Sequence, residues 1–436
     1  MDPSALVSSC HGNVTVRRQP DGTPRRTHLF DGWGRHPAPF STTSLTSALR
    51  AARAQASATI GDPFAGSARA GTRAVGRGHR FVGIEAHPLI GELASIKLSR
   101  PGPEEELLLA VDELLGEPLG MDWDLDHESP AVRRFVSIDA LPALCELRGR
   151  IASRPGPWST HLRWALLSVV RSATASGWPY GRTGGSGLGA DAVANAVRAA
   201  VETMASDLSA APVAPDARLL LSDSRLPETW DAVPAESWDA VVSSPPYLNQ
   251  LNYLEATRLE LLFLQPAQSP AQMRRDFGAG LLRSSTQQVT VRPSEEAWEN
   301  LQENVPRVYD SLLPIAEQLL LARRTRPQGK PYDRLLPCYF AEIAAVLSFQ
   351  LRAMAAGSRA VWVIGDSAPY GIRVDTPALI GQAAVSLGYE LIGDQQIRSR
   401  GKRWETSRRA GLSLSERMIV LRRPSSGAVQ LPLPGL

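Results

Sequence analysis

The sequence contains little cysteine and little lysine, and it lacks long apolar runs. Its 436 residues include three cysteines, Cys10, Cys145 and Cys338, and none stands in a C-x-x-C pair. This excludes a disulfide framework and a C-x-x-C zinc site, and the seven scattered histidines show no metal-ligand spacing. No apolar run approaches the roughly 18 residues that span a bilayer. We therefore expect a cytoplasmic protein with no metal and no membrane association.

The charge of the chain is nearly balanced, with a formal net charge of +3. Only three residues are lysine, so 44 of the 47 basic residues are arginine. Arginine suits bidentate contacts to phosphate, but a GC-rich genome explains the bias equally well. With 43% apolar and 21% charged residues, the composition is that of an ordinary globular protein and does not by itself identify a partner.

Continuous apolar runs alternate with helical patterns over most of the chain. The runs predict strands at 58–61, 80–85, 218–223, 238–243, 360–366 and 416–421, with helices at 41–56, 339–356 and 377–387. Runs of this kind suit strands that are buried on both faces. We therefore predict an α/β fold with a doubly wound, mostly parallel, Rossmann-like sheet.

Residues 90–215 differ in character from the strand-rich parts of the chain. Helical spacing recurs at 107–115, 162–170 and 190–204, separated by joints rich in proline and glycine. We interpret this segment as a helical insertion. The predicted division of the chain is an N-terminal arm (1–35), the first part of the core (36–89), the insertion (90–215), further core (216–265), a helical segment that could recognise a target (266–338), the remainder of the core (339–424) and a tail (425–436).

The first predicted strand ends in a tight turn of small residues. The turn comprises Asp62, Pro63, Phe64, Ala65, Gly66 and Ser67 and leads into a helix. Such a turn lets a ligand approach the backbone, and a helix N-terminus offers unpaired N–H groups. Glu85 closes the next strand, where a carboxylate can accept both hydroxyl groups of a ribose. The alternative is a plain strand–turn–helix connection with an incidental acid.

A second strand end carries the segment Ser244-Pro245-Pro246-Tyr247. Consecutive prolines cannot donate to a ladder, so the strand stops here. They also hold the Pro245 carbonyl in a fixed direction, next to the Ser244 hydroxyl and the flat ring of Tyr247. Two acceptors and an aromatic face fit an exocyclic amino group on a planar base. A rigid turn with a packed tyrosine is the alternative.

The combination D-P-F-x-G-S, an acid at the end of the second strand, and S-P-P-Y resembles the S-adenosylmethionine-dependent DNA amino-methyltransferases. The resemblance implies S-adenosylmethionine as cofactor, DNA as partner and an accompanying restriction or defence-system partner. It assigns the target amino group to Ser244, Pro245, Pro246 and Tyr247. By the same resemblance, the residues that would contact the cofactor are Asp62, Pro63, Phe64, Gly66, Ser67, Glu85 and Asp223. Asp223 matches the family pattern more loosely than the others. The chain departs from the family pattern at Ala68 and Arg69, where glycine and threonine are usual.

The resemblance implies methylation of a base that has flipped out of the duplex, because a stacked base cannot reach such a site. The serine form of the tetrad favours cytosine N4 as the methylated atom, with adenine N6 as the alternative. An RNA base methyltransferase of the guanine-N2 type and a catalytically silent DNA-binding subunit also stay open.

A cluster of basic residues is the predicted phosphate-binding loop, with a solvated loop as the alternative. Its members are Arg398, Arg400, Lys402, Arg403 and Arg408. The segment 274–292, which includes Arg283, could reach base edges. Asn304-Val305 and Pro337-Cys338 mimic motifs of cytosine-C5 methyltransferases, which use a cysteine nucleophile, but they occur in reversed order.

Overall fold

The computed structural model describes residues 29–34, 40–120, 123–174, 190–212, 216–249, 252–265, 269–399 and 414–425. It confirms the predicted α/β class with a seven-stranded sheet in the order β3-β2-β1-β4-β5-β7-β6. All neighbours pair in parallel except β7, which is antiparallel to β5 and β6. The strands are β1 (Thr59–Asp62), β2 (Arg80–Glu85), β3 (Ala217–Leu221), β4 (Trp238–Ser243), β5 (Met354–Gly365), β6 (Glu390–Ser399) and β7 (Ser415–Arg422).

The strand order reverses between β1 and β4. From β1 the chain builds outward through β2 to β3, and then returns to place β4 on the other side of β1. The two strands are parallel neighbours, with Ile60 opposite Ala240 and Gly61 opposite Val241. Ligands of open α/β sheets bind beyond the carboxyl ends of the strands at such a reversal. A ligand site is therefore expected at this edge.

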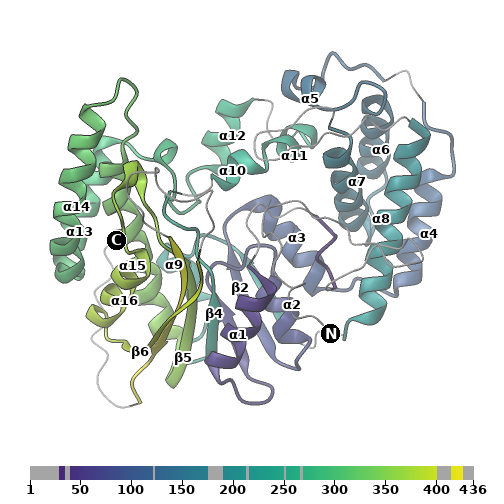
Figure 1. Cartoon of the computed structure of the whole chain (residues 1–436). Coiled ribbons are helices and arrows are strands. Elements are labelled where there is room, and N and C mark those ends of the chain that lie inside the picture. The colour runs from purple at the N-terminus through teal and green to yellow at the C-terminus, as the bar shows by residue number, and fades with distance from the viewer. Residues whose placement is uncertain are drawn as a thin grey trace, which may run out of the picture. The chain divides into compact units, whose positions relative to one another are not determined.

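Both faces of the sheet are buried, as the continuous apolar runs predict. Along β5, Val361 and Val363 pack toward one face, while Trp362 and Ile364 pack toward the other. The helices α1 (Thr42–Ala52), α2 (Arg69–Val75) and α3 (Pro88–Leu98) cover the first face. The second is covered by α13 (Val291–Asn304), α14 (Pro306–Arg324), α15 (Tyr332–Ala353) and α16 (Thr376–Ser386), which Figure 1 shows grouped together.

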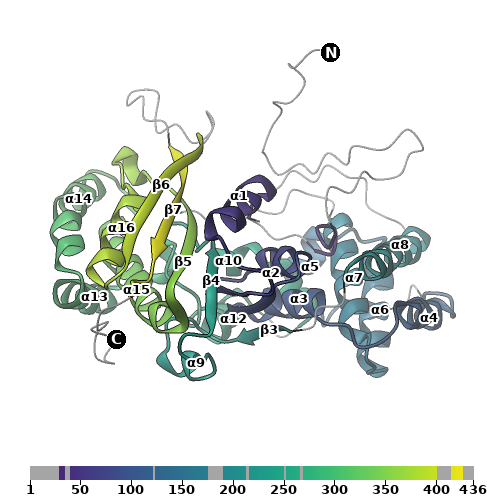
Figure 2. The same ribbon diagram turned by 90° about the horizontal axis from the view of Figure 1, so that it is seen from below.

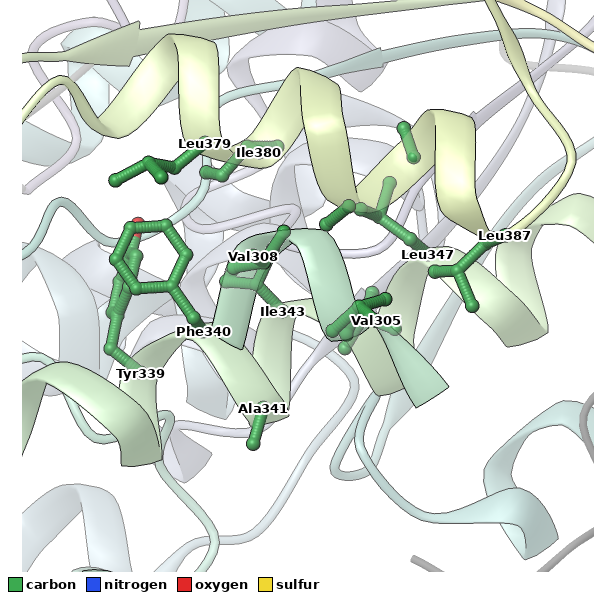
Figure 3. Packing of buried hydrophobic residues seen from close by; sticks show 14 of the residues in the cluster. Val305, Val308, Tyr339, Phe340, Ala341, Ile343, Leu347, Leu379, Ile380 and Leu387 are labelled. Atoms are coloured by element: carbon green, nitrogen blue, oxygen red, sulfur yellow. The ribbon is translucent and has the colours of Figure 1, made fainter. Parts of the chain in front are cut away.

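The helix α15 forms the centre of the larger core. Its apolar side chains pack against Val305, which precedes α14, against Val308 of α14, and against Leu379 and Ile380 of α16, as Figure 3 shows. Of the described helices, α15 alone has the length and apolar composition of a membrane span, and 83% of that window is buried inside the protein. Burial in the core accounts for its apolar character.

Shorter elements complete this part of the chain. They are α9 (Pro227–Asp231), α10 (Tyr253–Ala256), α11 (Arg258–Phe263), α12 (Pro270–Phe277) and the 3₁₀ turns η2 (Thr286–Gln288) and η3 (Pro369–Gly371). Figure 2 shows β6 and β7 as a hairpin beside β5. The helices α12 to α14 fall in the segment 266–338, so much of the predicted recognition segment contributes to the core.

The chain divides into two compact units, 1–35 with 101–211 and 36–100 with 212–436. The first unit contains α4 (Glu104–Leu115), α5 (Pro130–Phe135), α6 (Leu141–Ser153), α7 (Ser159–Ser172) and α8 (Ala190–Ala210). The buried carboxylate of Asp207 in α8 accepts hydrogen bonds from the Phe30 amide at 3.0 Å and the Trp33 indole at 2.9 Å. The described end of the predicted arm is thus packed against the helices.

One boundary and one strand differ from the sequence-based expectation. The helix α3 belongs to the unit that contains the sheet, so the helical insertion begins near residue 101 and not at 90. The strand β6 was not predicted. It is an edge strand with most side chains exposed, and so it carries no apolar run.

Candidate active site

The turn after β1 and the segment after β4 meet at the carboxyl edge of the sheet. The Ser243 hydroxyl donates to Oδ1 of Asp62 at 2.6 Å, and the Phe64 amide donates to the same oxygen at 3.0 Å. The Asp62 side chain is buried, and burial raises its pKa to about 7. Asp62 therefore ties together the two strand ends that the sequence singles out.

Glu85 lies at the end of β2 and faces the same turn. Its Oε2 accepts a hydrogen bond from the Gly66 amide at 2.8 Å, and its Oε1 accepts one from the His87 amide at 2.7 Å. Gly66 has a φ of 54°, in the region that favours glycine. The Ala86 amide also bonds this carboxylate, and because an ionised carboxylate has about four acceptor positions, acceptor capacity stays open to a ligand.

The other residues of the turn are close together but differ in exposure. Pro63 and Ser67 are buried, whereas Phe64 and Gly66 are half-buried. The Ser67 carbonyl accepts a hydrogen bond from the Lys97 ammonium group at 3.3 Å. Ala68 has a φ of 56°, a backbone conformation that glycine adopts more readily than alanine. Glycine is the usual residue at this position in the family that the turn resembles.

The S-P-P-Y segment is held by groups from three other elements. The Ser244 hydroxyl donates to the Val363 carbonyl at 3.0 Å, and the Tyr339 hydroxyl donates to the Pro246 carbonyl at 3.0 Å. Burial and the nearby Glu416 carboxylate raise the pKa of Tyr247 well above its usual value. Tyr247 therefore stays a neutral phenol. Sequence reasoning missed Tyr339 and Glu416, because both lie far beyond Tyr247 in the chain and belong to no motif.

Asp223 is engaged in a partly buried ion-pair network. Its two oxygens accept bonds from Nε and Nη2 of Arg225, at 2.6 to 3.0 Å. Nη1 of Arg225 contacts Glu342 of α15 at 2.6 Å, and Arg283 donates to Glu342 from both its amide and its guanidinium group. The carboxylate that was expected to contact the cofactor is thus paired within the protein.

The basic segment 398–409 is only partly described. Arg398 forms a bidentate pair with Glu416, with both distances 2.7 Å. Arg400, Lys402, Arg403 and Arg408 lie outside the described residues, so their contact with nucleic acid stays a prediction. Within the described ranges, no group of three or more His, Cys, Asp or Glu could hold a metal ion.

Cys338 lies inside α15 and is buried in the core. Its thiol lies 3.5 Å from the Pro293 carbonyl, and burial raises its pKa to about 11. A thiol nucleophile needs a lowered pKa and access to substrate. The resemblance of Pro337-Cys338 to a cysteine-nucleophile motif is therefore accidental.

If Glu85 binds the ribose of S-adenosylmethionine, as the sequence resemblance implies, its pKa predicts how the affinity for that cofactor depends on pH. Burial raises this pKa to about 7, and only the ionised form accepts both ribose hydroxyls. We expect the affinity for S-adenosylmethionine to rise by about tenfold from pH 6 to pH 8. Calorimetry at these pH values checks this, and Glu85→Gln should flatten the profile. Asp62 titrates in the same range, so Asp62→Asn separates its contribution. An affinity of the wild-type protein that does not change with pH would contradict the assignment.

Comparisons with known proteins give distant relatives. No family model matches the chain. A stretch of 156 residues, 35% of the chain, is 24% identical to the Type II methyltransferase M.AvaI, in versions from Nostoc sp. and Anabaena variabilis. The match spans 31% of the length of that methyltransferase.

Two solved structures have low sequence identity and low structural similarity to the chain. A candidate DNA modification methylase of Thermus thermophilus is 22% identical over 22% of this chain and 40% of its own, with a TM-score of 0.17. The [4+2]-cyclase SpnF is 7% identical in sequence, and the match covers 93% of this chain and 91% of SpnF, with a TM-score of 0.32. Scores this low carry no argument about function. By sequence, the chain is a distant relative of a Type II DNA methyltransferase over 35% of its length.

Proposed function

We propose that this protein transfers a methyl group from S-adenosylmethionine to the exocyclic amino group of a flipped DNA base. Cytosine N4 is the first candidate atom and adenine N6 the second. The supporting observation is the bond between Ser243 and Asp62, which joins the turn after β1 to the segment after β4. The distant sequence similarity to a Type II methyltransferase points the same way.

The residues around Glu85 fit an adenosine cofactor. A half-buried carboxylate with spare lone pairs suits the two hydroxyls of a ribose. Gly66 lets a ligand approach the backbone of the turn. Asp223 fits less well in this structure because Arg225 occupies both its oxygens. When bound, S-adenosylmethionine supplies an electrophilic methyl group on a positively charged sulfur.

In this proposal, Ser244 and Pro245 hold the target amino group. The lone pair of an exocyclic amine is delocalised into the ring, so the amine is a weak nucleophile. The Ser244 hydroxyl lies 3.0 Å from the Val363 carbonyl and 3.5 Å from the Tyr247 hydroxyl, and donation to the nearer Val363 carbonyl leaves a lone pair on its oxygen to accept an N–H bond. With the Pro245 carbonyl accepting the second N–H bond, the lone pair localises on nitrogen and is directed at the methyl group.

Replacement of Tyr247 by alanine tests the base pocket. If the ring stacks on the flipped base, its loss should cost roughly 1–3 kcal/mol in transition-state stabilisation. The measurement is kcat/KM for methyl transfer to DNA, with Tyr247→Phe as a control that keeps the ring. Wild-type turnover by Tyr247→Ala would remove Tyr247 from the pocket.

Transfer of tritiated methyl groups to duplex DNA and to tRNA tests the proposed substrate. We expect label in DNA, and mass spectrometry of the digested nucleosides then separates N4-methylcytosine from N6-methyladenine. Label in RNA alone would end the DNA proposal. Absence of S-adenosylmethionine binding by calorimetry would favour the alternative of a silent DNA-binding subunit.

A further inference from the structure

Four residues form an aromatic and basic surface at the carboxyl edge of the sheet, which we call the Tyr370 surface: Arg326, Lys330, Tyr332 and Tyr370. Tyr370 lies in η3, which follows the carboxyl end of β5. Arg326 and Lys330 lie between α14 and α15, and Tyr332 begins α15. The edge is the one that carries Asp62 and Ser244, because β1, β4 and β5 are parallel.

Three contacts hold the ring of Tyr370. Its centroid lies 4.8 Å from that of Tyr332 in an edge-to-face arrangement. Its hydroxyl donates to the Lys330 carbonyl at 3.0 Å. The guanidinium carbon of Arg326 lies 4.3 Å from the ring centroid, which is a cation–π contact. The ring therefore fixes the position of an arginine that is exposed to solvent.

The backbone at Tyr370 is strained. Its φ of 56° and ψ of 16° lie in the left-handed region, which costs a non-glycine residue roughly 1–2 kcal/mol. Such strain persists where the surroundings impose the conformation, and it is concentrated at functional sites. A glycine here would remove the strain but also the ring that holds Arg326.

The Tyr370 surface is connected to the proposed base pocket. The Asn249 side chain, two residues beyond Tyr247, lies near enough to the hydroxyl of Tyr332 to lower the pKa of that phenol in part. The Asn249 amide in turn donates to the Ser284 carbonyl at 2.8 Å. The segment that begins with Ser244 therefore runs directly to this surface.

The cations of this surface have no acidic partner in the part of the chain that the structure describes. Arg326 and Lys330 form no ion pair there, whereas the nearby Arg323 pairs with Asp333 at 3.1 Å. Exposed cations beside aromatic rings fit a phosphate backbone. We propose that the Tyr370 surface binds the phosphates of duplex DNA next to the flipped base, an inference that rests on the proposed function.

The salt dependence of DNA binding tests this inference. The fluorescence anisotropy of a labelled mixed-sequence DNA duplex of about 30 base pairs is measured with the full-length chain, at KCl concentrations from about 50 to 300 mM. The salt dependence reports phosphate contacts, because each contact contributes about 0.9 to the slope of log K against the log of the salt concentration. Arg326→Ala and Lys330→Ala should each reduce the slope by about 0.9 and weaken binding. Arg50→Ala, an exposed arginine at the end of α1 on the opposite edge, is the matched control and should leave the slope unchanged.

Each outcome supports or overturns the inference. Salt slopes of both variants equal to that of the wild-type protein would overturn it. Binding of tRNA that is tighter than binding of duplex DNA, and that depends on Arg326 and Lys330 in the same way, would also overturn it. Methyl transfer to DNA with unchanged slopes would reject this surface but keep the proposed function. Reduced slopes in a protein that transfers no methyl group would keep the surface and reject the proposed function.

Discussion

Replacement of Glu85 by alanine is expected to weaken S-adenosylmethionine binding by about 100-fold, with the fold retained. Hydrogen bonds to a charged group contribute about 1.5–3 kcal/mol each, and two ribose hydroxyls would lose theirs together. The lower end of that range for two bonds, about 3 kcal/mol, corresponds to slightly more than the stated factor. The same variant releases the Gly66 and His87 amides, which adds to the effect by loosening the turn.

Calorimetry with the wild-type protein, Glu85→Gln and Glu85→Ala measures this effect. Glu85→Gln keeps one carbonyl acceptor but removes the charge, so its affinity should lie between those of the other two proteins. Circular dichroism confirms that all three are folded. Unchanged affinity of a folded Glu85→Ala protein would mean that the ribose assignment is wrong.

Replacement of Glu342 by alanine is expected to lower the free energy of unfolding by about 2–3 kcal/mol, because Arg225 and Arg283 lose charged hydrogen bonds in a largely buried position, although Arg225 keeps its pair with Asp223. The Glu342 side chain is 10% exposed and contacts both Arg225 and Arg283 at 2.6 and 2.7 Å. It thereby joins α15 to the loop after β3 and to the segment that precedes η2.

Urea denaturation compares this variant with Glu296→Ala. Glu296 pairs with Arg292, but both side chains are largely exposed, at 60% and 87%. Exposed pairs contribute about 0–1 kcal/mol, so this control should change stability little. Equal losses for the two variants would show that the Glu342 network does not stabilise the fold.

The strands of the sheet could be predicted because burial on both faces requires apolar runs. The runs at 238–243 and 416–421 correspond to β4 and β7 within one residue. The strand β6 could not be predicted, because its sequence ELIGDQQIRS is that of an exposed edge. The helix α15 begins at Tyr332 and not at residue 339, since buried positions continue toward its N-terminus as far as Leu335.

The residues of the two motifs could be predicted, but their partners could not. Asp62 and Glu85 stand at strand ends that local patterns reveal. Arg225, by contrast, occupies Asp223 and also reaches Glu342, which is 117 positions away in the sequence. Pairings across such separations leave no mark in the local periodicity.

The sequence by itself determined which segments are the buried strands and where two of them end, because strand length and apolar spacing are local properties. Only the tertiary structure decided that those ends are neighbours, since the order of strands depends on how the sheet packs against its helices. The same packing set the protonation of Asp62 and Glu85, whose pKa values follow from burial that no local pattern reports. It also placed Tyr370 beside Arg326 and Tyr332, contacts that exist only in the folded chain.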